Sequence, residues 1–134
     1  MGIPERKERE KELRREEILK AAQAIFFEKG LQNATMEEIA EAAELSKGTL
    51  YLYYSSKEDL YLAVMIRGME ILYEMFAKSV SNAPTPLHAI KALGETYLEF
   101  FNTHRMFFRM FHFFQNPQLH KQVSEDMIQA CSIH

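Results

Sequence analysis

Two short helical patterns separated by a three-residue break, within residues 35–60, constrain the fold of this chain more than any other feature. Thr35 and Glu38 form a capping box, in which a hydroxyl and a carboxylate satisfy free backbone N–H groups at a helix start. The apolar residues that follow share one helical face: Met36, Ile39, Ala40 and Ala43. Ser46 then caps a second short helix, predicted over residues 47–54. Two short helices joined by a tight turn are typical of the helix-turn-helix motif, whose second helix enters the major groove of DNA.

The outward surface of the second predicted helix carries hydroxyl groups and one cation and lacks acidic residues. Leu50 and Tyr54 are four positions apart, so both are expected to face the core. On the opposite side, Gly48 removes a side chain where a phosphate or a base edge must come close. Hydroxyl and ammonium groups bind phosphate oxygens, and flat rings pack on sugars or on a thymine methyl group. The residues predicted on this surface are Lys47, Gly48, Thr49, Tyr51 and Tyr53.

This stretch of the chain resembles the TetR family of bacterial transcription regulators. The shared motifs are the run SKGTLY at residues 46–51, the pair Tyr53-Tyr54 and the run SKEDL at residues 56–60. Upstream, the matching positions are Ile18, Leu19, Ala22, Phe26, Gly30, Thr35, Ile39 and the run AEAA at residues 40–43. The resemblance extends from residue 14 to residue 66 and combines capping, core and surface positions in one order.

The resemblance implies an all-α fold in two parts. Residues 1–62 are expected to form a three-helix DNA-binding domain that contains the helix-turn-helix, and residues 63–134 a helical ligand-binding and dimerisation region. Family members usually continue with two further long helices that form the dimer interface, so the second region is expected to be truncated here. The family positions that typically contact DNA correspond to Thr35, Lys47, Gly48, Thr49, Tyr51, Tyr53 and Lys57.

The function that the resemblance implies is ligand-responsive regulation of transcription. The protein is expected to act in the cytoplasm as a repressor, and to bind a pseudo-palindromic operator in double-stranded DNA as a homodimer in its full-length form. An apolar small molecule is expected to release it from DNA, and no cofactor is implied. The sequence leaves one alternative open. This is a helical protein that binds a small molecule or a partner and has little DNA-binding activity in its truncated form.

The charge of the predicted DNA-binding domain weakly favours the alternative. Residues 1–62 hold 10 Lys and Arg against 13 Asp and Glu, a net charge of −3, whereas DNA-binding domains are usually basic. The net negative charge argues less strongly against DNA binding once its distribution is considered, because residues 45–57 contain Lys47 and Lys57 and no acid. Few ion contacts with phosphate are therefore expected, and with them a shallow dependence of DNA binding on salt concentration.

The rest of the chain is predicted to be helical as well. Long helices are expected over residues 57–80 and 86–103, separated by a turn that contains two prolines. The apolar residues expected on the inner side of the helix at 86–103 are Leu87, Ile90, Leu93, Tyr97 and Phe101. Two more helices are predicted, one over residues 104–114 and one that begins at Asn116.

Residues 97–114 hold seven of the ten phenylalanines of the chain. Phenylalanine and methionine surround this short segment on all sides, which is more than one buried helix face requires. Three interpretations of this stretch remain open. It is an ordinary aromatic core, the lining of a cavity for an apolar ligand, or a surface that further helices cover. The residues predicted to bind an apolar ligand are Met65, Met69, Leu72, Tyr97, Phe101, His104, Phe108, Phe111 and His112.

Several functional classes lack support in the sequence. It contains no nucleophile motif and no glycine-rich phosphate loop, so the chain is not expected to be an enzyme. The histidines lack HxxxH spacing and no CxxC occurs, so no metal site is expected. No apolar run is long enough to cross a membrane. Because Cys131 is the only cysteine, no internal disulfide can form, which fits a reducing cytoplasm.

Overall fold

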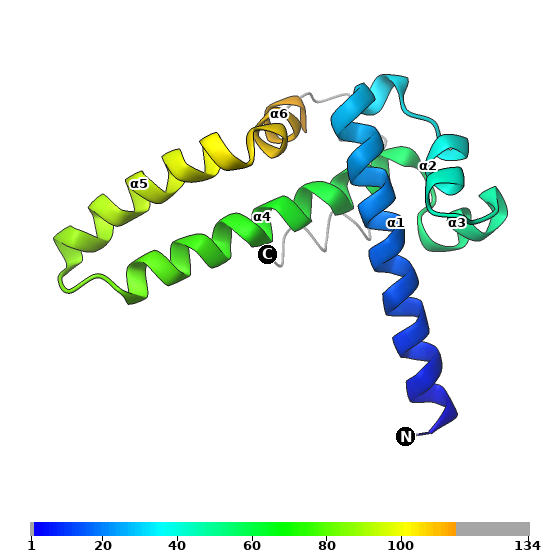
Figure 1. Ribbon diagram of the computed structural model, residues 1–134, viewed down its shortest axis with the longest axis horizontal. Helices are drawn as coiled ribbons and strands as arrows, with labels where there is room; N and C mark the ends of the chain where they lie inside the picture. Colours follow the sequence, from blue (N-terminus) through cyan, green and yellow to red (C-terminus); the bar gives the residue numbers. More distant parts are fainter. Residues whose placement is uncertain (1, 115–134) are drawn as a thin grey trace. The chain divides into compact units, whose positions relative to one another are not determined.

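The computed structural model describes residues 2–114, and this part of the chain consists of helices joined by short turns (Figure 1). The helices are α1 (Ile3–Asn33), α2 (Met36–Ala42), α3 (Lys47–Tyr53), α4 (Lys57–Ser81), α5 (Pro86–Thr103) and α6 (Arg105–Phe114). The predicted all-α fold is confirmed for the described range. The last predicted helix, from Asn116, and Cys131 lie outside it.

The two halves of α1 differ in their surroundings. Its first half is charged and mostly exposed, whereas Ile18, Ala22 and Phe26 recur every four residues in the second half and are at most 3% exposed. This spacing places them on one face of the helix, which packs into the core. Gly30 has a φ of 76°, in the left-handed region that favours glycine, and the regular helix is interrupted there.

Both short helices begin at the capping residues that the sequence predicts. The Thr35 hydroxyl accepts a hydrogen bond from the Glu38 backbone N–H at 3.1 Å and donates one to the Glu38 carboxylate at 3.0 Å. The Ser46 hydroxyl accepts from the Thr49 backbone N–H at 3.1 Å. These bonds satisfy N–H groups that have no partner within the helix, and they fix where α2 and α3 start.

The turn between α2 and α3 carries a non-glycine residue in a left-handed conformation. Glu44 has a φ of 59°, and the next residue, Leu45, donates its backbone N–H to the Ala40 carbonyl at 2.9 Å. This bond closes the C-terminal end of α2, and the reversal at Glu44 directs the chain into Ser46 and α3. The break that the sequence shows at residues 44–46 is therefore the turn of the helix-turn-helix.

The described residues form two compact units, which divide between Val64 and Met65. The first unit contains α1, α2, α3 and the start of α4; the second contains the rest of α4 with α5 and α6. Buried apolar side chains from every helix make the core of the first unit: Ile18, Ala22, Phe26, Met36, Ile39, Leu50, Leu60 and Tyr61. The rings of Phe26 and Tyr61 meet edge to face, with centroids 5.2 Å apart.

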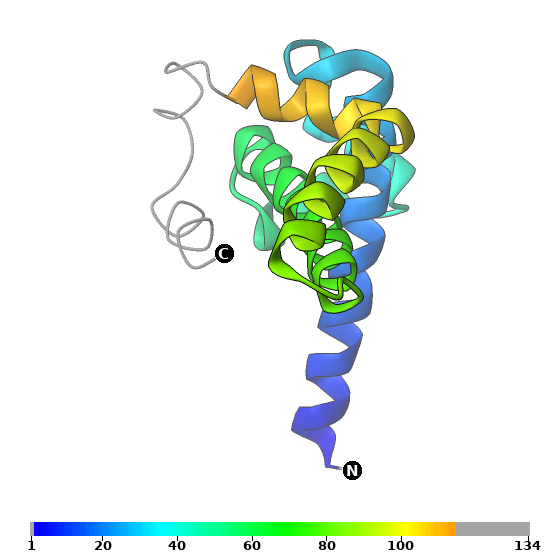
Figure 2. The same cartoon turned by 90° about the vertical axis from the view of Figure 1, so that its left-hand side faces the viewer.

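The second unit is a helical hairpin completed by α6. After the turn at residues 82–85, α5 runs back in the direction opposite to α4, and the two helices lie beside each other in both views (Figures 1 and 2). The Thr85 hydroxyl accepts from the His88 backbone N–H at 3.2 Å and caps α5, which starts at Pro86 as the sequence predicts. A Cβ atom at Gly68 would lie only 2.3 Å from Phe107 Cδ1, because the buried ring of Phe107 rests directly on α4.

The predicted inner face of α5 is wrong for the described residues. Leu87, Ile90, Tyr97 and Phe101 are 76%, 67%, 47% and 41% exposed. Thr96 and Phe100 are buried instead. The predicted apolar face of α5 therefore lies to one side of the face that is buried. Apolar residues occur on more than one side of this helix, and their periodicity does not decide which side meets α4 and α6.

Candidate nucleic-acid interface

The α3 helix presents one face to the core and the other to solvent. Leu50 is fully buried and Tyr54, at the C-cap, is 8% exposed, in agreement with their predicted core positions. On the other side Lys47, Gly48 and Tyr51 are exposed. Thr49 and Tyr53 are half-buried at the two edges of this surface. The five residues that were predicted on α3 therefore occupy its outer side, and we call this set the α3 surface.

Lys47 is held by a carboxylate of the preceding helix. Its ammonium group forms an ion pair and hydrogen bond with Glu37 of α2, and it also lies 5.9 Å from the centre of the Tyr51 ring. The hydrogen bond with Lys47 lowers the pKa of Glu37, and the same bond raises the pKa of Lys47. Both groups are consequently charged at neutral pH, and a phosphate that binds Lys47 must compete with Glu37.

Replacing Glu37 by Gln is expected to tighten binding of this chain to duplex DNA. The change removes a negative charge beside the α3 surface and leaves Lys47 available to a phosphate. One additional phosphate contact steepens the plot of log affinity against log salt concentration by about 0.9. Fluorescence anisotropy with a labelled duplex at several salt concentrations measures both effects.

The matched control for this change is Glu41→Gln. Glu41 lies one turn after Glu37 on α2 and is exposed, so its replacement alters the net charge equally without touching the pair with Lys47. Glu41→Gln is expected to leave the salt slope unchanged. Equal slopes for all three proteins would show that Glu37 does not withhold Lys47 from DNA.

The threonine hydroxyls predicted to contact DNA already serve as structural groups. Thr35 exchanges hydrogen bonds with Glu38, whose carboxylate is also paired with Lys29. The Thr49 hydroxyl shares a hydrogen bond of 2.8 Å with the Ser46 hydroxyl. A hydroxyl has one donor and two acceptor positions, so Thr49 can still donate to a phosphate if Ser46 becomes the donor of their shared bond.

Gly48 has no role in packing within the described residues. A Cβ atom added there would meet nothing within 4 Å. Glycine inside a helix costs about 0.5–1 kcal/mol relative to alanine, so its presence on α3 lowers the stability of this short helix. The only benefit that the geometry offers is a flat patch on the outer side, where a DNA backbone or base edge can come close.

Gly48→Ala is therefore expected to stabilise the fold and to weaken DNA binding at the same time. The predicted gain in the free energy of unfolding is about 0.5–1 kcal/mol, measured by urea denaturation. The predicted loss of affinity is measured by mobility shift with the same duplex. A variant that gains stability and keeps full DNA affinity would show that no close approach occurs at Gly48.

Two further side chains, one in the middle of the α3 surface and one beside it, were not among the residues predicted from the sequence. Leu52 is 85% exposed on α3 itself, and helical spacing places it opposite Leu50. Arg15 of α1 lies over the ring of Tyr53, with its guanidinium carbon 5.8 Å from the ring centre. Helical spacing alone could have identified Leu52. No local signal separates Arg15 from the many charged residues around it.

Lys57 lies at the start of α4 and touches the end of α1. Its ammonium group donates hydrogen bonds to the backbone oxygens of Ala34 at 3.1 Å and Gln32 at 3.4 Å. Carbonyl groups at a helix C-terminus carry partial negative charge, which attracts a cation. An ammonium group has three donors, so a phosphate contact at Lys57 stays a prediction beside this structural role.

The predicted ligand-binding residues lie in the second unit, and the structure brings four of them together. The Phe108 ring lies 5.2 Å from Tyr97, 5.0 Å from Phe101 and 6.2 Å from Phe111, all measured between centroids. Phe100, which was not in the predicted set, is the buried centre of this aromatic cluster. The cluster is defined as Tyr97, Phe100, Phe101, Phe108 and Phe111.

The other predicted ligand-binding residues have mixed surroundings. Met65 is buried, and Met69 and Leu72 are half-buried on α4. The half-buried imidazole of His104 stacks on Phe100, with centroids 5.0 Å apart. His112 is exposed, so a predicted role in an enclosed aromatic cavity is not supported for this residue.

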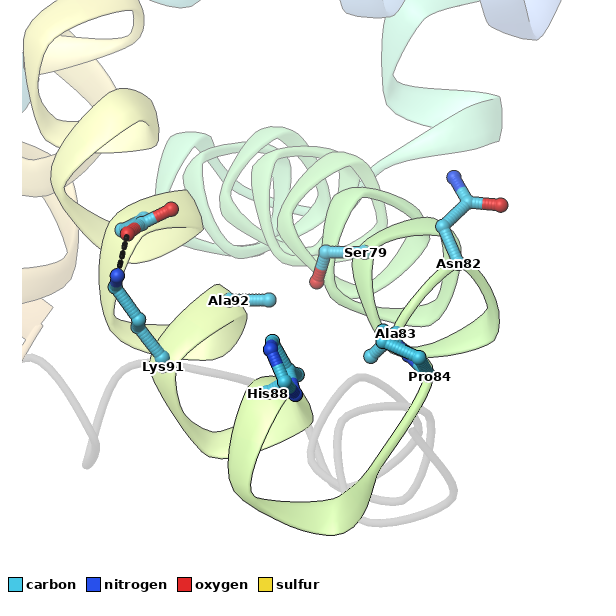
Figure 3. A pocket seen from close by; sticks show the side chains of 8 residues that line it. Ser79, Asn82, Ala83, Pro84, His88, Lys91 and Ala92 are labelled. Carbon is cyan, nitrogen blue, oxygen red and sulfur yellow. Dashed lines mark ion pairs between the residues drawn. The ribbon is translucent and has the colours of Figure 1, made fainter.

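A pocket of about 340 Å³ lies elsewhere in the second unit, at the turn between α4 and α5 (Figure 3). Its lining residues are Ser79, Asn82, Ala83, Pro84, His88, Lys91, Ala92 and Glu95. None of the predicted ligand-binding residues is among them. The lining is mixed and carries an ion pair between Lys91 and Glu95, with 4.0 Å between Nζ and Oε1, so it does not resemble a site for an apolar molecule.

Neither a metal cluster nor a membrane span occurs within the part of the chain that the structure describes. No group of three His, Cys, Asp or Glu side chains over residues 2–114 is arranged to hold a metal ion. Over the same range no helix has the length and apolar character that crossing a membrane requires.

Comparison with known proteins assigns the first unit to a family. Residues 18–64 match the sequence model described as bacterial regulatory proteins, tetR family. The match begins at the first buried residue of α1 and includes all seven predicted DNA-contacting residues. The matched family consists of regulatory proteins and not of enzymes, which agrees with the prediction from the sequence.

Individual relatives extend the similarity into the second unit. The HTH-type transcriptional activator FasR of Mycolicibacterium smegmatis is 32% identical over 115 residues, which cover 82% of this chain and 52% of the relative. The HTH-type transcriptional repressor KstR2 of Mycobacterium tuberculosis is 31% identical over 80 residues, covering 60% of this chain and 40% of the relative. The solved structure of the fatty acid degradation regulator FadR from Bacillus halodurans has a TM-score of 0.59 and 25% identity, covering 68% of this chain and 49% of that one. The chain thus spans about half the length of these relatives, or less.

Proposed function

We propose that this chain, which belongs to the TetR family of bacterial regulatory proteins through its N-terminal unit, regulates transcription by binding operator DNA with α2 and α3. The observation that carries the proposal is the α3 surface. It is outward, free of acids and rich in hydroxyl groups, on a helix whose other side is fixed in the core by Leu50. Such groups bind phosphate oxygens and base edges in the major groove.

The proposed mode of action is repression by a homodimer. A helix-turn-helix protein reads a pseudo-palindrome when two recognition helices lie about one turn of DNA apart, which requires two copies of the chain. An occupied operator then excludes the transcription machinery, in the cytoplasm where bacterial DNA lies. Similarity to KstR2, which is named a repressor, supports repression. Similarity to FasR, which is named an activator, makes activation the competing outcome.

Selection of duplexes from a random pool tests the proposal. The 134-residue chain is incubated with the pool, bound duplexes are amplified over several rounds, and the enriched sequences are compared. Enrichment of one half-site, or of two inverted half-sites, is expected. A pool that stays random, with binding that does not depend on sequence, would favour the alternative of a helical protein with little DNA-binding activity. A reporter gene behind the selected sequence then distinguishes repression from activation.

We also propose that an apolar small molecule controls this regulator through the second unit. The aromatic cluster offers three half-exposed or half-buried rings around Phe108, next to Phe100 at its buried centre. Apolar pockets are typically lined by such residues with few polar groups. The name of FadR, a regulator of fatty acid degradation, makes fatty acids the first compounds to test. Release from DNA would follow only from a difference in ligand affinity between two conformations.

Replacing Phe108 by Ala is expected to weaken fatty acid binding by at least about tenfold, since burial of a phenylalanine side chain contributes about 1.5–3 kcal/mol. DNA affinity without ligand should stay unchanged, because Phe108 lies outside the first unit. Thermal melting with saturated fatty acids of increasing length measures the binding, with the exposed Tyr73→Ala as the control. If no fatty acid raises the melting temperature of the unmodified chain, the aromatic cluster is ordinary core.

A further inference from the structure

One leucine stands on the side of α3 that faces away from the core. Leu52 is 85% exposed, more than any other large apolar side chain in the described part of the chain. Successive residues of a helix are rotated by about 100°, so Leu52 points about 200° away from Leu50, which is fully buried. Packing within the first unit therefore gives no reason for an apolar residue at this position.

The neighbours of Leu52 place it at the middle of the α3 surface. Gly48 lies one turn earlier on the same side and carries no side chain, so it leaves the approach to Leu52 open. Lys47 and Tyr51 flank this line on one side, and Thr49 and Tyr53 flank it on the other. Single exposed leucines are common on protein surfaces, but this one is surrounded by groups that bind phosphate.

We propose that Leu52 contacts the C5-methyl group of a thymine in the major groove and thereby helps to determine which base pair the protein prefers. The inference rests on the proposed DNA-binding function. In the major groove, thymine is the base that presents a methyl group, whereas the remaining base edges present hydrogen-bond donors and acceptors. A leucine packed on those polar groups would remove them from water without replacing their hydrogen bonds, which is unfavourable. Leu52 is thus a specificity-determining residue for A·T at one position of each half-site.

Removal of the thymine methyl group tests this contact directly. The duplex selected by the unmodified chain is synthesised with each thymine of one half-site replaced singly by deoxyuridine, which differs only in lacking the methyl group. At one position the affinity of the unmodified chain is expected to fall about fourfold, the loss for one buried methyl group. Leu52→Ala should bind the thymine and deoxyuridine duplexes equally, because it lacks the side chain that touches the methyl group.

Leu52→Met is the matched control, because it keeps an apolar side chain of similar reach. It should retain the preference for thymine over deoxyuridine at the same position, and helical content measured by circular dichroism should be equal for all three proteins. The proposal is overturned if no deoxyuridine position weakens the unmodified chain, or if Leu52→Ala loses affinity on replacement as strongly as the unmodified chain does. A selection that enriches no duplex overturns the proposed DNA-binding function, and this inference with it.

Discussion

The double variant Thr49→Ala/Tyr51→Ala is expected to lose at least about 100-fold in affinity for the duplex that the unmodified chain selects. A hydrogen bond to a charged group such as phosphate contributes about 1.5–3 kcal/mol, so two of them contribute about 3–6 kcal/mol if they act independently. Thr49 lies at an edge of the α3 surface and Tyr51 is exposed on it, so in the proposed mode of binding both hydroxyl groups are expected to contact the DNA backbone. Mobility shift assays at one salt concentration measure the loss.

The structure indicates that this variant should remain folded. Ser46 caps α3 by accepting from the backbone N–H of Thr49, and alanine keeps that N–H. Alanine is also a good helix former, so neither replacement penalises the helix. Tyr73→Ala serves as the control, because Tyr73 is 72% exposed on the part of α4 that belongs to the second unit. Unchanged affinity in the double variant would remove α3 as the DNA-contacting helix.

Leu50→Ala is expected to lower the free energy of unfolding by about 2–5 kcal/mol, whereas Leu52→Ala should change it by less than about 0.5 kcal/mol. The two leucines are two positions apart on the same helix, and they differ in exposure, 0% against 85%. Truncation of Leu50 leaves a cavity between α3 and the remainder of the first unit, while truncation of Leu52 removes a side chain that is mostly exposed to solvent. Urea denaturation of the 134-residue chain, followed by helical circular dichroism, measures both changes.

This pair of variants also separates stability from recognition. Leu50→Ala should weaken DNA binding only to the extent that the chain is unfolded, so a lower temperature should restore binding. Leu52→Ala should stay folded and lose its preference for thymine. A large loss of stability in Leu52→Ala would mean that the outward face of α3 is covered in solution, which would contradict the assignment of this face to DNA.

The helix boundaries of the first unit were predictable because they depend on local chemistry. The hydroxyls of Thr35, Ser46 and Ser56 cap helices by accepting hydrogen bonds from the backbone N–H three residues later, and Gly30 adopts a left-handed conformation that few other residues adopt easily. Each of these features involves residues close together in the chain. The inward positions of Leu50 and Tyr54 follow from the same local helix geometry.

The tertiary structure alone decided which distant groups meet. The pairing of Lys47 with Glu37, the placement of Arg15 over Tyr53 and the bonds from Lys57 to the end of α1 join residues of different helices. The buried side of α5, with Thr96 and Phe100, was likewise not predictable, because apolar residues lie around more than one side of that helix. A sequence shows capping, turns and periodicity, since these depend on a few neighbouring residues. It does not show which of several exposed charges or apolar faces finds a partner, because that choice depends on how whole helices pack.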